Sequence, residues 1–159
     1  LHYDWSQGPD PRRIIKTEAL FEQMLHAQGG DVGYIHMLLE NGRLPQNWLD
    51  GSEVTTIRAM IEDLRHRFPE ARYANEFRLG RLITKIFDGI EKEPNGRYFV
   101  KAGDNGPIIQ RSMRYIFPPL PEARRRFQQY IGAPVPWNED VAAWQLDPDP
   151  EYPGDSDVI

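Results

Sequence analysis

Apolar residues recur along most of this chain at the three- and four-residue spacing of amphipathic helices. Four such stretches precede residue 90, and each follows a residue type that commonly caps a helix. The expected caps are Thr17, Asp31, Ser52 and Asn75, and the helices end near Gly29-Gly30, Asn41-Gly42, Pro69 and Gly89. The pattern therefore predicts four helices, each with one apolar face.

Beyond residue 90 the pattern becomes strand-like. After a break at residues 94–96, strand-forming residues occupy 96–101 and 107–117, on either side of a turn rich in Gly, Asp and Asn at 102–106. Pro118-Pro119 ends the second strand, and residues 120–131 return to helical spacing. These features predict a β-hairpin followed by a last helix.

The charge of the chain is segregated. The 159 residues carry a net charge of -5, but residues 137–159 hold seven acids and no Lys or Arg, so residues 1–136 hold 17 acids and 19 bases. Residues 65–126 alone hold 14 bases and seven acids. A basic body with an acidic tail is compatible with nucleic-acid binding, although the whole-chain pI of 5.4 would argue against such binding.

The fourth predicted helix carries the first candidate site. Arg78, Arg81 and Lys85 are spaced so that they share the face opposite the apolar one, and Asn75 lies at the N-terminus. Cations at this spacing can contact phosphates while residues near the N-terminus of a recognition helix reach base edges. A solvated amphipathic helix with no ligand is the alternative interpretation.

The hairpin carries the second candidate site. Arg97, Lys101, Arg111 and Arg114 would lie on or near a wing that follows the DNA backbone or minor groove. A structural hairpin whose cations only prevent edge pairing is the alternative. The run Arg124-Arg125-Arg126 is more typical of a solvated helix face that pairs with Glu122 and the acidic tail than of a phosphate site.

Other chemistry finds little support in the sequence. The four histidines show no metal-ligand spacing, and the absence of cysteine excludes thiolate sites and disulfides. Neither GxxxxGK[ST] nor GxGxxG occurs, and no stretch of 18 apolar residues suggests a membrane span. We expect no metal, no cofactor, no membrane and no catalytic residue in this chain. The start at Leu1 favours a fragment or a processed chain.

The predicted fold class is α+β and mainly helical: a winged helix-turn-helix with an extra N-terminal helix, a C-terminal helix and an acidic tail. Residues 1–16 are expected to form a linker or arm, 17–132 the winged-helix-like domain, and 133–159 a disordered acidic tail. The tail alternates acids with apolar residues, which suits docking to a partner protein, covering the basic groove in competition with DNA, or merely solubilising the chain.

Short ordered motifs carry a family resemblance. They are Thr17-Glu18-Ala19-Leu20 with Gln23, Leu38–Pro45 with Trp48, Glu76–Leu82, and Arg114–Arg124 with Phe127. In this order they resemble the C-terminal region of phage and prophage DNA primase-helicases of the poxvirus-like type, which contain a superfamily 3 helicase. The resemblance covers roughly residues 3 to 130. The fourth helix departs from the family pattern, because Phe77 is followed by Arg78 rather than Gly.

The resemblance implies a non-catalytic accessory domain that engages DNA at the origin or fork in the cytoplasm of a bacterial host. ATP hydrolysis and primer synthesis would belong to other parts of a larger protein. Its partners would be DNA, the parent helicase and primase domains, and other replisome proteins through the tail. The alternative is a protein–protein interaction module that packs on the helicase ring or on another replisome component.

Overall fold

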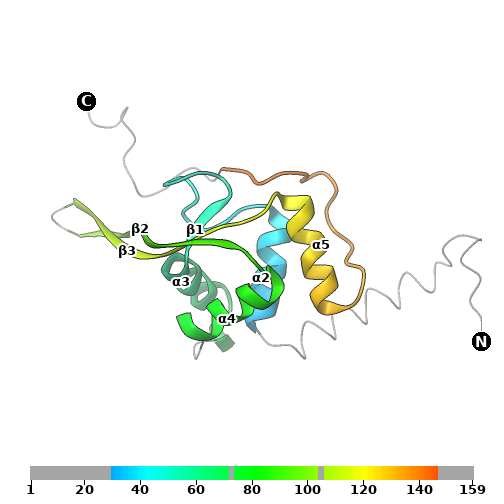
Figure 1. The fold of residues 1–159 in the computed structure, drawn as a ribbon. Coiled ribbons are helices and arrows are strands. Elements are labelled where there is room, and N and C mark those ends of the chain that lie inside the picture. The colour runs from blue at the N-terminus through cyan, green and yellow to red at the C-terminus, as the bar shows by residue number, and fades with distance from the viewer. Residues whose placement is uncertain (1–29, 72–73, 104–105, 147–159) are drawn as a thin grey trace, which may run out of the picture.

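The computed structural model describes residues 30–71, 74–103 and 106–146. In these ranges it contains four α-helices and one three-stranded antiparallel sheet, so the fold is mixed α+β (Figure 1). The elements are α2 (Gly30–Asn41), β1 (Val54–Thr56), α3 (Ile57–Arg67), the short 3-10 helix η2 (Pro69–Ala71), α4 (Glu76–Ile86), β2 (Glu91–Gly103), β3 (Gly106–Ile116) and α5 (Leu120–Ile131). The predicted arm at 1–16, the helix from Thr17 and the end of the tail lie outside the described residues.

The sheet has the strand order β1-β3-β2, so the short strand β1 pairs with β3 on the edge opposite β2. β2 and β3 form the long hairpin that extends to one side of the helices (Figure 1). Helix α3 packs against β3 and α4, and α5 packs against α2 and α4. One apolar cluster fills the space between these elements, with Tyr34, Ile83 and Phe127 among its fully buried members.

The start of α3 differs from its prediction. Ser52 was expected to cap a helix that included Val54, but Val54–Thr56 form β1 and pair with Ile116, Tyr115 and Arg114 of β3. Thr56 is the actual cap, and its hydroxyl accepts a hydrogen bond from the backbone N–H of Ala59 at 3.3 Å. The apolar spacing at residues 54–56 is compatible with a helix or a strand. The strand forms because β3, which is distant in sequence, provides backbone hydrogen-bond partners.

The start of α4 follows its prediction. The side-chain oxygen of Asn75 accepts a hydrogen bond from the backbone N–H of Arg78 at 2.9 Å, which confirms Asn75 as the cap. The expected apolar face is buried: Leu79, Leu82, Ile83 and Ile86. In contrast, α2 begins at Gly30, so Asp31 lies in its first turn rather than at its cap.

The hairpin begins earlier than predicted. β2 starts at Glu91 and passes through residues 94–96, where a break was expected. One extra residue on β2 between Glu93 and Gly96 forms a bulge, which accommodates Pro94 without ending the strand. Gly96 is required there, because a Cβ atom at this position would lie 2.3 Å from the Cβ of Arg114.

The packed part of the chain continues beyond residue 132, where the predicted tail begins. Val135 and Trp144 are buried, and the indole N–H of Trp144 donates to the carbonyl oxygen of Pro118 at 2.8 Å. The Gln145 N–H bonds to the carbonyl oxygen of Gly42 at 2.8 Å. Residues 133–146 therefore pack against α2 and α5, because their aromatic and apolar side chains are buried in the same apolar cluster.

The three consecutive arginines of α5 do not all lie on its solvated face. Arg125 and Arg126 pair with Glu122, as the solvated interpretation expected. Arg124 is only 8% exposed, and its guanidinium donates to the carbonyl oxygens of Leu39 and Glu40 at the end of α2 and of Val141. Its expected place on the exposed face was therefore wrong, since burial against α2 offers carbonyl groups that the helix leaves without partners.

Candidate nucleic-acid interface

The cations of α4 lie on its exposed face. Arg78, Arg81 and Lys85 are all solvent-exposed, and none of them forms an ion pair with another residue in the described part of the chain. The guanidinium carbon of Arg81 lies 5.6 Å from the ring centroid of Phe77, one turn earlier on the helix. The helix therefore offers three positive charges that no acid in the described ranges neutralises.

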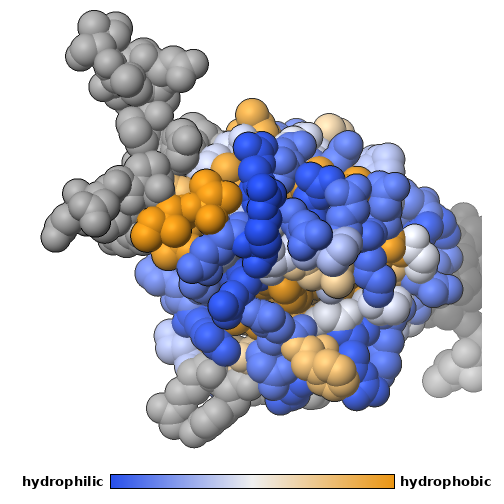
Figure 2. All heavy atoms as spheres, turned by 60° about the vertical axis from the view of Figure 1, so that its left-hand side comes forward, coloured by the Kyte–Doolittle hydropathy of each residue, from blue (hydrophilic) through white to orange (hydrophobic). Residues whose placement is uncertain are grey.

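A groove of about 660 Å³ lies between α4 and the sheet. Apolar atoms of Ile57, Met113 and Tyr115 contribute to its lining. A Cβ atom on Gly80 would lie 3.1 Å from the Tyr115 hydroxyl, so the small residue lets α4 approach β3 closely. Figure 2 shows that hydrophilic side chains dominate the face turned toward the viewer and that apolar surface appears in separate patches.

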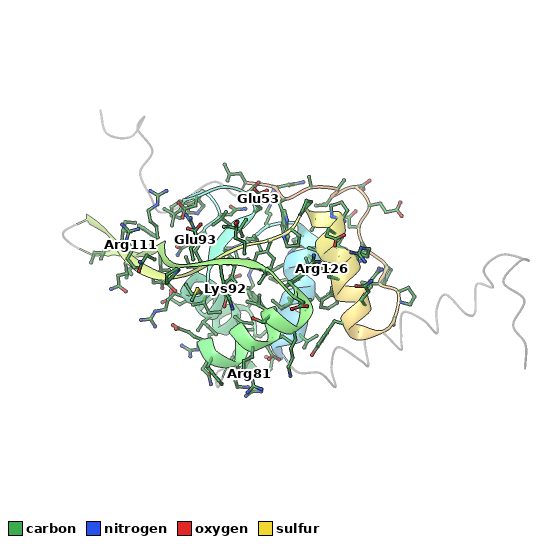
Figure 3. All side chains as sticks on the ribbon, in the orientation of Figure 1. Glu53, Arg81, Lys92, Glu93, Arg111 and Arg126 are labelled. Carbon is green, nitrogen blue, oxygen red and sulfur yellow. The ribbon has the colours of Figure 1, made fainter. Side chains whose placement is uncertain are left out.

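Charged residues border this groove on both sides. Arg81 and Lys85 come from α4, and Lys92 comes from β2, where it lies opposite Tyr115 in the strand register. Figure 3 shows Arg81 and Lys92 on these two elements. Glu76 also lines the groove, but its carboxylate is paired with Arg58 at 3.1 Å. The groove thus combines an apolar interior with cations that have no acidic partner among the described residues.

Two of the predicted cations of the hairpin, unlike those of α4, are paired with acids. Arg97 pairs with Asp50 at 2.7 Å and also donates to the carbonyl oxygen of Leu49. Arg114 is partly buried between Asp50, at 3.7 Å, and Glu93. These acids neutralise both arginines, so their attraction for a phosphate is weaker than that of the α4 cations.

Two further hairpin cations complete the predicted set. Arg111 is exposed on β3 and donates to the carbonyl oxygen of Asn95 at 3.3 Å. The backbone of Lys101 belongs to β2, but its side chain lies outside the described residues. The structure therefore brings Arg78, Arg81 and Lys85 together on α4 and places Arg97 and Arg114 beside Asp50. Arg111, labelled in Figure 3, lies on β3 opposite Arg97 in the strand register.

Sequence reasoning missed Lys92 and the exposed ring of Phe77. Lys92 was overlooked because the hairpin was expected to begin only at residue 96. Phe77 was treated as part of a motif, yet its side chain is 72% exposed. The helical spacing held the necessary signal, because Phe77 falls on the same side of α4 as Arg81 and opposite the buried Ile86.

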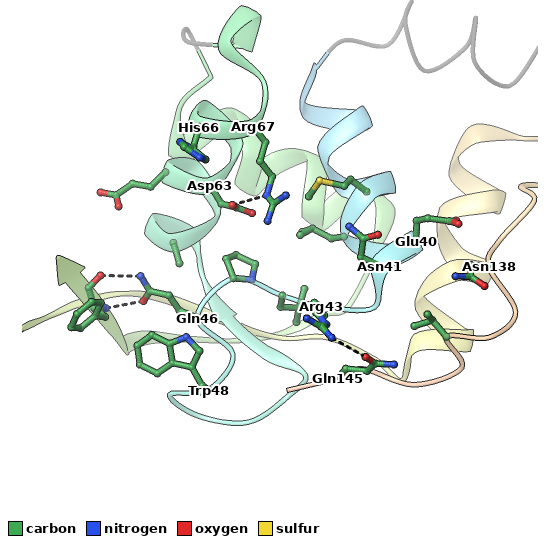
Figure 4. Close-up of a pocket in the computed structure, with 18 residues that line it drawn as sticks. Glu40, Asn41, Arg43, Gln46, Trp48, Asp63, His66, Arg67, Asn138 and Gln145 are labelled. Carbon is green, nitrogen blue, oxygen red and sulfur yellow. Dashed lines mark hydrogen bonds and ion pairs between the residues drawn. The ribbon is translucent and has the colours of Figure 1, made fainter. Parts of the chain in front are cut away.

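A second, larger cavity of about 890 Å³ lies between the end of α2, α3 and residues 43–48 (Figure 4). Several of its polar groups bond to one another or to the backbone beside them. Gln46 makes two hydrogen bonds to the backbone of Phe99, at 2.9 and 2.8 Å, and Arg67 pairs with Asp63 at 2.8 Å. Asp63 also accepts a hydrogen bond from the Tyr34 hydroxyl, whose pKa is raised by burial and by this carboxylate. These bonds explain the positions of Gln46, Asp63 and Arg67, whereas Oε2 of Glu40 in the same lining is buried without a hydrogen-bond partner among the described residues.

Neither cavity contains a metal-binding cluster, since no three His, Asp or Glu side chains come together among the described residues. In the same ranges, none of the helices has the length and apolar character needed to cross a membrane. Comparisons with known proteins place the chain in no family: no protein-family model, no curated protein and no solved structure matches it.

Proposed function

We propose that this chain is a winged-helix domain that binds DNA without catalysing a reaction, and that it serves as an accessory domain of a phage-type replicative primase-helicase. The order α2-β1-α3-α4-β2-β3 and the strand order β1-β3-β2 support the winged-helix part of the proposal. In this arrangement α3 and α4 form the helix-turn-helix, α4 is the recognition helix, and the hairpin is the wing.

One observation carries the DNA-binding proposal. Arg78, Arg81 and Lys85 share the exposed face of α4, the helix that would enter the major groove of DNA. None of the three is paired with an acid in the described residues. Holding like charges together without counter-charges is unfavourable unless solvent or a ligand compensates for the repulsion. A polyanion that places its phosphates along α4 would provide this compensation and release its own counterions.

The test is a salt titration of DNA affinity with the whole chain. Fluorescence anisotropy with a labelled forked duplex between about 50 and 200 mM salt should give a linear fall of log affinity with log salt. Substitution of Arg78, Arg81 and Lys85 by Ala should weaken binding and reduce the slope by roughly 0.7 to 0.9 for each lost phosphate contact.

The control is Arg125→Ala, which removes an exposed cation of α5 outside the proposed interface. It should leave both affinity and slope unchanged. An affinity that does not depend on salt, or an equal effect of the control, would refute the proposed contacts.

The alternative function is a protein–protein interaction module that packs on the helicase ring or another replisome protein. The exposed ring of Phe77, together with Ile108 and Ile109 on β3, favours this reading, because exposed apolar groups are typical of docking surfaces. Charge reversal at Arg81 and Lys85 would then disrupt assembly with the partner and leave DNA affinity unchanged. Co-purification with the parent helicase measures the first effect and anisotropy the second.

A further inference from the structure

The groove beside α4 has one feature that duplex binding does not use. Phe77 is 72% exposed, and it shares the groove lining with apolar groups of Met113 and Tyr115. Base pairs in a duplex are already stacked on each other, so a ring on the protein gains little from them. Unpaired bases, in contrast, readily stack on an exposed aromatic ring.

The surroundings of the ring match the backbone of such a strand. Arg81 lies over the Phe77 ring at 5.6 Å, and Lys85 and Lys92 flank the same groove from opposite elements. The acid in the lining, Glu76, is paired with Arg58. Positive charge on two sides of an apolar groove is the combination by which proteins hold single strands, with phosphates on the rims and bases inside.

We propose that this groove binds a single-stranded segment of nucleic acid and that an unpaired base stacks on Phe77. The phosphates on either side of that base contact Arg81 and Lys85 on one rim and Lys92 on the other. The groove is open to solvent, and its volume of about 660 Å³ leaves room for a base. This inference rests on the proposed DNA binding and specifies its substrate as DNA with unpaired bases, as at a fork.

The experiment compares three labelled probes with the whole chain: a short oligothymidine, a blunt duplex of equal length, and a fork. Phe77→Ala should weaken binding of the single strand by roughly five- to 150-fold through the loss of one stacked base, and should change duplex affinity less than twofold. Phe77→Tyr, which keeps an aromatic ring, should retain the affinity for the single strand.

Leu146→Ala is the control, because Leu146 is also an exposed apolar residue and lies outside the groove. It should leave all three affinities unchanged. A strand that carries 2-aminopurine gives a direct readout, since its fluorescence is quenched when the base stacks. The wild-type chain and Phe77→Tyr should quench it, and Phe77→Ala should not.

The outcomes separate this proposal from the one on which it rests. If Phe77→Ala has no effect, or weakens single-strand and duplex binding equally, while removal of the α4 cations still weakens both, the stacking proposal is wrong and DNA binding stands. If the chain binds none of the probes, both proposals are wrong and the exposed ring is assigned to a protein partner.

Discussion

Replacing Arg124 tests the most unexpected contact in the structure. Its guanidinium donates to the carbonyl oxygens of Leu39 at 3.0 Å, Val141 at 2.6 Å and Glu40 at 3.3 Å, and it lies 5.2 Å from the ring centroid of Trp137. Burial lowers the pKa of Arg124, but an arginine remains charged at any ordinary pH. One side chain therefore ties α5 to the end of α2 and to the segment after residue 132.

The loss of unfolding free energy expected on replacing Arg124 follows from these contacts. A hydrogen bond to a charged group contributes about 1.5–3 kcal/mol, and the three bonds share one group, so their effects do not simply add. Arg124→Met keeps most of the aliphatic stem and removes the donors. We expect it to lower the free energy of unfolding by about 3 kcal/mol, because three carbonyl oxygens lose their charged donor while no buried charge is left behind. That is a large part of the stability of a typical domain.

The assay is urea unfolding of the whole chain, followed by tryptophan fluorescence, because Trp137 and Trp144 both lie in the segment that Arg124 anchors. Arg125→Met is the control, since Arg125 is exposed and, within the described ranges, pairs with Glu122 alone. Its unfolding midpoint should be close to that of the wild type. Equal midpoints for the two variants would show that Arg124 is a surface cation like its neighbour, and would refute the reasoning.

Two further predictions concern stability. Burial lowers the pKa of His36 to about 4, so its neutral form stabilises the fold above pH 6.5 and this contribution is lost as pH falls toward 4. His36→Gln should lose about 2 kcal/mol less between pH 7 and 4 than the wild type in urea unfolding, and a profile identical to that of His66→Gln would contradict this. Gly96→Ala should cost about 2–3 kcal/mol through its clash with Arg114, whereas Gly132→Ala, at a φ of 79° with open space around it, should cost about 1 kcal/mol. Thermal unfolding ranks these two glycine variants, and the reverse order would disprove the steric argument.

Local patterns predicted much of the fold. The apolar spacing of α4 and its cap at Asn75 were readable because both depend on residues within one or two helical turns. The hairpin was readable from its strand formers and its turn. For the candidate site, Arg78, Arg81 and Lys85 were identified from spacing alone, and the structure places them together on one exposed face.

Contacts between distant segments were not readable. The strand β1 exists because β3 lies beside it, and Asp50 neutralises Arg97 and Arg114 across more than forty residues of sequence. Nothing in the run Arg124-Arg125-Arg126 distinguishes the buried arginine from its exposed neighbours. Only the approach of α2 gives Arg124 carbonyl partners and removes it from the surface.

The sequence by itself determined which segments are amphipathic, where most helices begin or end, and that positive charge gathers in the second half of the chain before an acidic end. The tertiary structure decided which of those charges are available. Charges on α4 and Lys92 have no acidic partner among the described residues, those beside Asp50 are neutralised, and Arg124 is buried. The physical reason is that helix periodicity depends on neighbours in the chain, whereas the electrostatic state of a side chain depends on whatever the fold places within a few ångströms of it.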